Sequence, residues 1–152
     1  MSLSLVATNP TTEPRLGPAQ TIVFRFNKPV VSGAATITES AAVVDTVTFA
    51  GNEMTVNLAG VDNHQYVTVA VSNVVAADGG AGGSATARIG YLVGDVNQNR
   101  VVSLSDLALV NAELAQFVTS SNYLMDINAS GTLTIADKAI ANANLATALP
   151  PP

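Results

Sequence analysis

The sequence predicts a multidomain protein of the β plus α class, in which a β-sandwich is followed by a small α-helical module. Two observations lead to this prediction. Residues 1 to 91 are rich in Val, Thr and short alternating runs, whereas residues 94 to 149 are rich in Ala, Leu and Asn. The second part also repeats one pattern of oxygen-bearing side chains, at 94–106 and again at 126–137. We therefore expect one module at residues 1–92 and another at residues 93–152.

Six segments of the first part have the alternating or β-branched pattern of strands. They are Thr21 to Phe26, Ala35 to Glu39, Asp45 to Ala50, Glu53 to Ala59, Gln65 to Val71 and Ala85 to Leu92. Turn-forming residues separate them at short intervals, as expected for two packed antiparallel sheets. The period of two predicts that these side chains point inward: Ile22, Phe24, Phe26, Val47, Phe49, Met54, Val56, Leu58, Val67, Val69 and Val71.

The runs TIVFRFNKPV and NLAGVDNHQYVTVAVSNVVAADGG are similar to those of bacterial immunoglobulin-like and fibronectin-type-III-like modules. This resemblance implies an immunoglobulin-like β-sandwich that spaces or supports its neighbours. Carbohydrate binding is the alternative, but the sequence contains no Trp and only 5% aromatic residues. We expect Tyr66 to pack as a corner residue. We expect His64, the only histidine, to lie in a solvated turn rather than act as a metal ligand or base.

Composition excludes several classes of function. The formal net charge is −5 and only 11% of residues are charged, so no basic surface is available for nucleic acid or anionic lipid. No apolar run approaches the roughly 18 to 20 residues that a membrane-spanning helix needs. The absence of Cys excludes disulfides and thiolate metal sites. The first residues lack the pattern of a signal peptide, and we expect one to be missing from this sequence.

The repeated pattern matches the twelve-residue calcium loop of an EF-hand, whose ligands stand at positions one, three, five, seven, nine and twelve. The first copy offers Asp95, Asn97, Asn99, the carbonyl of Val101, Ser103 and Asp106. The second offers Asp126, Asn128, Ser130, the carbonyl of Thr132, Thr134 and Asp137. Apolar residues also correspond, with Val96 and Ile127 at position two and Val102 and Leu133 at position eight, where paired loops meet. We predict two calcium ions; two solvated turns are the alternative, but they leave the shared spacing unexplained.

A helix is expected after each loop, in LSDLALVNAELAQF and in IADKAIANANLA. In the first of them Leu107, Val110, Leu114 and Phe117 form an apolar stripe that predicts a buried face. Arg100 stands at the sixth loop position, where Gly is usual, and the expected positive φ costs about 1 kcal/mol. Two carboxylates per loop suit one structural ion, so we expect folding of residues 94–149 to depend on calcium.

Two loop-helix units joined by a short connector, with GDVNQNRVVSLSD opening the first and Asp at both twelfth positions, resemble a type I dockerin. The resemblance implies two EF-hand-like calcium loops and docking onto a cohesin domain. It implies a monomeric, extracellular or cell-surface protein, carbohydrate-active or attached to such an enzyme, in an assembly such as a cellulosome that breaks down polysaccharide. The implied partner face comprises Leu104, Ser105, Asn111, Ala112, Ile135, Ala136, Asn142 and Ala143.

Alternatives remain at this point. Leu104 and Ile135 replace the first residue of the family's common Ser-Thr pair, so the identity of the partner is open and both side chains could instead pack internally. A calcium-stabilised spacer without a cohesin partner is the second functional reading. A hydrolase fragment is the third, but the loops use four of the aspartates and we expect no enzyme activity. We also expect Tyr91 and Leu92 to meet Leu149 and Pro150.

Overall fold

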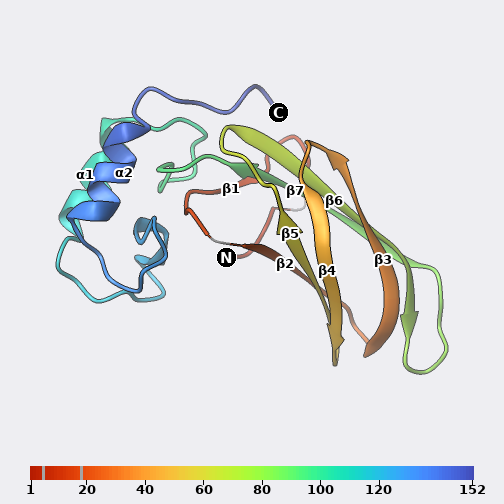
Figure 1. Ribbon diagram of the computed structural model, residues 1–152. Coiled ribbons are helices and arrows are strands. Elements are labelled where there is room, and N and C mark those ends of the chain that lie inside the picture. The colour runs from red at the N-terminus through yellow and green to blue at the C-terminus, as the bar shows by residue number, and fades with distance from the viewer. Residues whose placement is uncertain (5, 18) are drawn as a thin grey trace.

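The computed structural model describes residues 1–4, 6–17 and 19–152, and two packed β-sheets form its larger part (Figure 1). The four-stranded sheet has the order β1-β7-β6-β3. Its strands are β1 (Thr11–Glu13), β7 (Gly83–Tyr91), β6 (Gln65–Ala76) and β3 (Val30–Glu39). The three-stranded sheet has the order β2-β5-β4. Its strands are β2 (Gln20–Arg25), β5 (Glu53–Ala59) and β4 (Val43–Ala50). The predicted β-sandwich of the first part is therefore confirmed.

Alternation of buried and exposed side chains explains how the two sheets pack. Along β5, Met54, Val56 and Leu58 are buried, while the residues between them are partly exposed. All positions predicted to face inward lie in one apolar core or pack against it. Neighbouring strands are antiparallel except for β1, which pairs in parallel with the end of β7. The three residues of β1 were not predicted as a strand.

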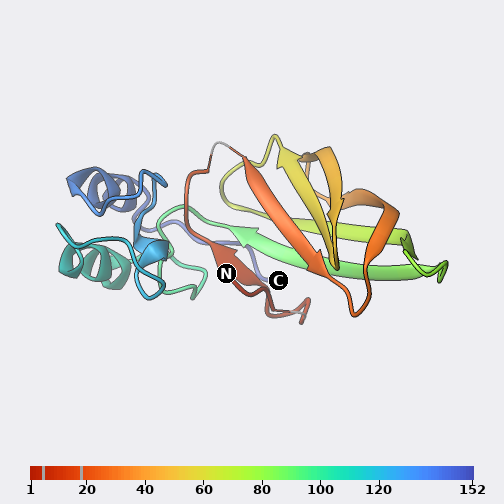
Figure 2. The ribbon, with the colours of Figure 1, turned by 90° about the horizontal axis from the view of Figure 1, so that it is seen from below.

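The predicted α-helical character of the second part is wrong. In the part of the chain that the structure describes, the helices are α1 (Leu104–Ala112), α2 (Ile135–Ala143) and the short 3-10 helix η1 (Tyr123–Met125). Each α-helix has only nine residues, and loops and turns make up most of residues 93–152. The protein as a whole is mainly β, with two short helices at one end of the sandwich (Figure 2).

Both helices end early because the chain after them pairs with a loop instead of continuing the helix. Ala115 has a left-handed φ of 65°, and its amide donates to the carbonyl of Leu133 at 2.9 Å. Ala146 has a φ of 64°, and its amide donates to the carbonyl of Val102 at 2.9 Å. Phe117 therefore lies beyond α1 and is 91% exposed, which corrects its predicted place in a buried stripe. The tertiary hydrogen bonds outweigh the local helix preference of these Ala-rich segments.

The end of the chain returns to the sandwich (Figures 1 and 2). Leu149 packs with Leu92, Tyr66 and Val102 in one small cluster. The expected contact between Leu92 and Leu149 is thus present, whereas Tyr91 belongs to the core of the sandwich. Among the described residues, no helix is both long and apolar enough to cross a membrane.

Candidate metal loops

The four aspartates predicted as the first and last ligands are all buried, and two main-chain amides bond to each of them. In the first loop, amides donate from Asn99 and Arg100 to Asp95 (3.0 and 2.8 Å) and from Asn97 and Ser103 to Asp106 (3.1 and 3.0 Å). In the second, they donate from Ser130 and Gly131 to Asp126 (2.9 and 2.8 Å) and from Asn128 and Thr134 to Asp137 (3.2 and 2.8 Å). Each hydrogen bond has its counterpart in the other loop.

The backbone of both loops turns at the same places. In the first loop φ is 60° at Gln98 and 74° at Arg100, and in the second it is 54° at Ala129 and 84° at Gly131. The expected positive φ of Arg100 is confirmed. These left-handed residues curve each loop so that its main-chain amides point at the carboxylates. The last ligand positions, Asp106 and Asp137, also stand in the first turn of α1 and α2, where a carboxylate favours a helix N-terminus.

The environment of the first loop disfavours the charged form of Asp95. Burial raises the pKa of Asp95 above its ordinary value, although the amides of Arg100 and Asn99 favour the charged form. The nearby carboxylate of Asp106 raises it further. Among the described residues, no Lys or Arg forms an ion pair with a loop aspartate. Two buried carboxylates that share a loop and form no ion pair fit a bound cation.

The set of donors indicates which cation would fit. Each loop combines two carboxylates with amide, hydroxyl and main-chain carbonyl oxygens, which are the hard ligands that calcium prefers. Among the described residues, His, Cys, Asp and Glu side chains do not gather in groups of three or more that could hold a metal ion. This result does not bear on the loops, because each contains only two such residues.

The apolar residues at corresponding positions anchor the two loops. Val96 and Ile127 lie in one buried cluster with Val110 and Ala141 of the helices. Among the described residues, however, no β-bridge joins Val102 to Leu133, as paired loops would have at these positions. Each bonds instead to the segment that follows the opposite helix, as described above. This crosswise pairing closes the two loop-helix units into one body.

The residues proposed as a partner face are all exposed on α1 and α2. Leu104 and Ile135 are 72% and 70% exposed, so the alternative that they pack internally is wrong. The remaining six residues are also exposed: Ser105, Asn111, Ala112, Ala136, Asn142 and Ala143. The side chain of Lys138 donates to Asn111 at 2.6 Å and links the two helices.

No protein-family model, curated protein or solved structure matches this chain.

Tyr66 and His64, the two residues of the sandwich that the sequence analysis discussed, both lie where they were predicted. Tyr66 is buried, with its ring 4.0 Å from the guanidinium of Arg88, as expected for a packed residue. His64 lies exposed in a turn with a φ of 63°, as predicted.

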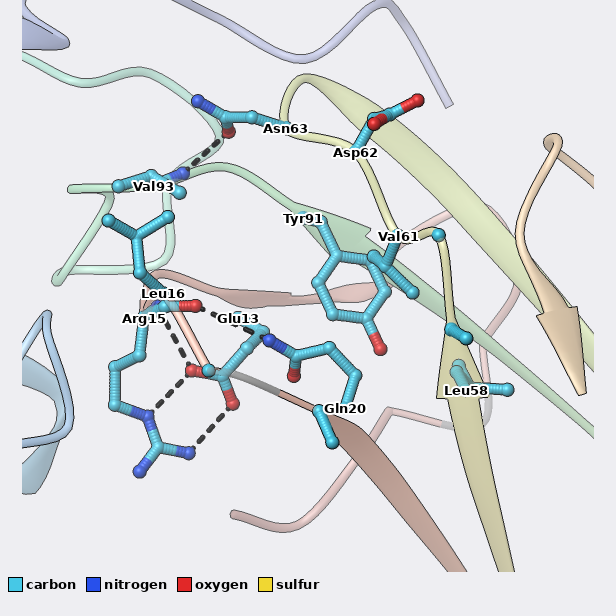
Figure 3. Close-up of a pocket in the computed structure, with 14 residues that line it drawn as sticks. Glu13, Arg15, Leu16, Gln20, Leu58, Val61, Asp62, Asn63, Tyr91 and Val93 are labelled. Atoms are coloured by element: carbon cyan, nitrogen blue, oxygen red, sulfur yellow. Dashed lines mark hydrogen bonds and ion pairs between the residues drawn. The ribbon is translucent and has the colours of Figure 1, made fainter. Parts of the chain in front are cut away.

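A pocket of about 190 Å3 lies where the sandwich meets the start of the second part of the chain, near Tyr91 and Val93 (Figure 3). The carboxylate of Glu13 lines it and is already paired with Arg15, at 2.7 and 2.8 Å. Asn63 accepts a hydrogen bond from the amide of Val93 at 2.8 Å. Burial raises the pKa of Tyr91, which stays neutral there. These groups stabilise the junction between the two parts of the chain.

Sequence reasoning missed the contacts that the loops make with β1 and with the residues just after it. The side chain of Gln98 donates to the carbonyl of Thr12 at 2.7 Å, and the amide of Leu16 donates to the carbonyl of Ile127 at 2.6 Å. No local pattern in the sequence marks either contact, because the partners are more than eighty residues apart.

Proposed function

We propose that residues 93–152 bind two calcium ions and that the ion-bound module docks onto a cohesin domain through the exposed faces of α1 and α2. One observation carries the first half of this proposal. In both loops, main-chain amides donate equivalent hydrogen bonds to the buried carboxylates. Both loops also have an oxygen-bearing group at every ligand position of an EF-hand loop.

The ion supplies the positive partner that no ion pair gives the loop aspartates. Asp95 and Asp106 hold it in the first loop, and Asp126 and Asp137 hold it in the second, so that each pair of carboxylates balances one divalent cation. Amide, hydroxyl and carbonyl oxygens of the loop complete the shell. Because the same aspartates fix the start of α1 and α2, loss of the ion would leave repelling carboxylates at both helix starts. The ions therefore act as a scaffold for the two helices.

The docking half of the proposal rests on the exposed apolar side chains and on the resemblance to type I dockerins. Leu104 and Ile135 stand at equivalent positions of the two units, each at the first turn of its helix. Burying such side chains against a partner gains about 25 cal/mol per Å2. The other six residues of the proposed face are uncharged, so the face suits an apolar contact rather than one built on charge. Attachment of a secreted, carbohydrate-active protein to a scaffold follows from this assignment.

A calcium-stabilised spacer is the second candidate. The observation that favours it is the extent of contact between the second part of the chain and the sandwich, through Leu149, Asn144 and the first loop. A spacer needs such a fixed junction but no exposed partner face. We propose no catalytic role, because the loop carboxylates are accounted for as ion ligands.

Calorimetric titration with calcium chloride, followed by binding to a panel of cohesins with and without chelator, tests the proposal. We expect two bound ions and cohesin binding that chelator abolishes. The double change Leu104→Asp and Ile135→Asp should abolish cohesin binding while both ions still bind. The matched control is Val43→Asp, which changes an exposed residue of the sandwich. Calcium binding without affinity for any cohesin would support the spacer, and no calcium binding would reject both candidates.

A further inference from the structure

Thr12, the middle residue of β1, carries a buried hydroxyl group without a hydrogen-bond partner. The residue is 0% exposed and pairs with Gly90 of β7. The adjacent Thr11 differs, because its hydroxyl accepts a hydrogen bond from the amide of Ser4 at 2.7 Å. Buried polar groups in folded proteins are nearly always satisfied, so an unpaired hydroxyl at this position requires an explanation.

The surroundings of Thr12 belong to the first loop. Its carbonyl accepts from the side chain of Gln98, and the amide of Gly94 donates to the carbonyl of Pro14 at 3.0 Å. The Thr12 hydroxyl favours the charged form of the Asp95 carboxylate and so lowers its pKa, although the two groups form no hydrogen bond of normal geometry. A buried, unpaired hydroxyl of the sandwich thus stands beside the first loop.

The second loop lacks this arrangement among the described residues. The hydrogen bonds to Asp126 come from Ser130 and Gly131 of its own loop. The sandwich contributes a main-chain contact between Leu16 and Ile127, and the charge of Arg15 lies near. The two loops are therefore alike internally but unequal in what the sandwich gives them.

We propose that Thr12 is a positioning residue of the first calcium loop, whose hydroxyl donates a hydrogen bond to Asp95 when the ion is bound. This inference rests on the proposed calcium binding. Carboxylates that bind a metal are generally held by hydrogen bonds from outside the ligand shell, and loss of such a partner typically lowers metal affinity by about 10- to 100-fold. Thr12 supplies this bond from another module of the same chain.

The arrangement couples the first ion to the sandwich. If the ion tightens the contact between Asp95 and Thr12, the docking of β1 must strengthen binding of the ion by the same factor. The second ion has no such coupling, because no hydroxyl group of the sandwich bonds to Asp126 among the described residues. The two sites should therefore differ in their response to changes in β1, although their internal geometry is nearly the same.

Titration of the full chain with calcium chloride tests the inference. Thr12→Val keeps the shape of the side chain and removes the hydroxyl, whereas Thr12→Ser keeps the hydroxyl. Both changes are tested in an Asp137→Asn background, which removes a carboxylate of the second site so that the first is measured alone. Thr12→Val should lower calcium affinity about 10-fold or more, and Thr12→Ser should restore most of it. A thermal midpoint in chelator that Thr12→Val leaves unchanged would show that the fold is intact.

The outcomes separate this inference from the proposed function. Equal affinity of Thr12→Val and its parent would overturn the role of Thr12 while calcium binding stands. A midpoint lowered equally in chelator and in calcium, with unchanged affinity, would make Thr12 a packing residue only and would also overturn it. If the unmodified chain binds no calcium, the proposed function fails, and the inference fails with it.

Discussion

The hydroxyl group of Tyr66 donates a hydrogen bond of 3.0 Å to the main-chain carbonyl of Pro150, across 84 residues of sequence. Leu149 packs beside this bond, against Leu92 and Val102. The amide of Leu149 also donates to the carbonyl of Arg100, in the first loop, at 3.0 Å. The segment around Leu149 and Pro150 thus contacts the sandwich and the first loop together. Changes in this segment should affect the stability of both.

Leu149→Asp should destabilise the full chain by about 2 to 5 kcal/mol, because it removes a buried apolar side chain and buries a charge without a partner. The free energy of unfolding from denaturant titration at fixed calcium measures this effect. The control is Phe117→Asp, since Phe117 is almost fully exposed and its replacement should change stability by about 0.5 kcal/mol or less. If the two variants unfold alike, the segment makes no net contribution.

The side chain of Leu149 lies close against β7 at Gly90. A Cβ atom there would collide with the side chain of Leu149 and approach the ring of Tyr66 at 3.2 Å. Gly90→Ala should therefore displace Leu149 and cost about 1 to 3 kcal/mol. Gly80→Ala is the control, because a Cβ at Gly80 meets only ordinary contacts. The pair is compared by thermal unfolding, and equal midpoints would mean that Leu149 shifts aside without cost.

The sequence was sufficient for features that depend on local spacing. The alternation of apolar residues predicted that Met54, Val56 and Leu58 point inward, because one face of each strand is buried in the core. The spacing of oxygen-bearing residues located Asp95 and Asp126 at the start of equivalent loops. In both cases the information lies within about a dozen residues, so that no knowledge of distant partners was needed.

Features that depend on distant partners could not be predicted. The ends of α1 and α2 are set by hydrogen bonds from Ala115 and Ala146 to the opposite loop, and an Ala-rich segment read alone favours further helix. The strand β1 has only three residues, and its parallel pairing exists because β7 offers a free edge there. The contact between Thr12 and the first loop also depends on this pairing, because the pairing places β1 beside the loop.

The ion pair between Glu39 and Arg88 gives the sandwich a dependence on pH. Hydrogen bonds from Arg88, assisted by Thr68, hold the pKa of Glu39 below its ordinary value of 4.5. The stabilisation is present at neutral pH and is lost as the pH falls through the lowered pKa, because protonation removes the charge. The side chain of Glu39 is 36% exposed, so solvent limits the contribution to about 1 kcal/mol or less.

Glu39→Gln should accordingly lower the free energy of unfolding at pH 7, and the difference from the unmodified chain should shrink as the pH falls below about 4. Denaturant titrations at pH 7 and at pH 3 measure both values. Glu53→Gln serves as the control, because its partner Arg25 has a side chain that is 78% exposed. A difference that is the same at both pH values would show that Glu39 acts through packing and not through its charge.

The sixth position of the two loops offers a reciprocal test of backbone strain. Arg100 and Gly131 both have left-handed φ values, 74° and 84°, but only Gly131 adopts such a conformation without steric cost. A Cβ at Gly131 would meet no atom within 4 Å, so Gly131→Ala should lose about 1 kcal/mol from backbone strain alone. Arg100→Gly should gain a similar amount. Unfolding of both variants in saturating calcium measures the two effects, and a loss of stability in Arg100→Gly would mean that packing of the Arg100 side chain outweighs the strain.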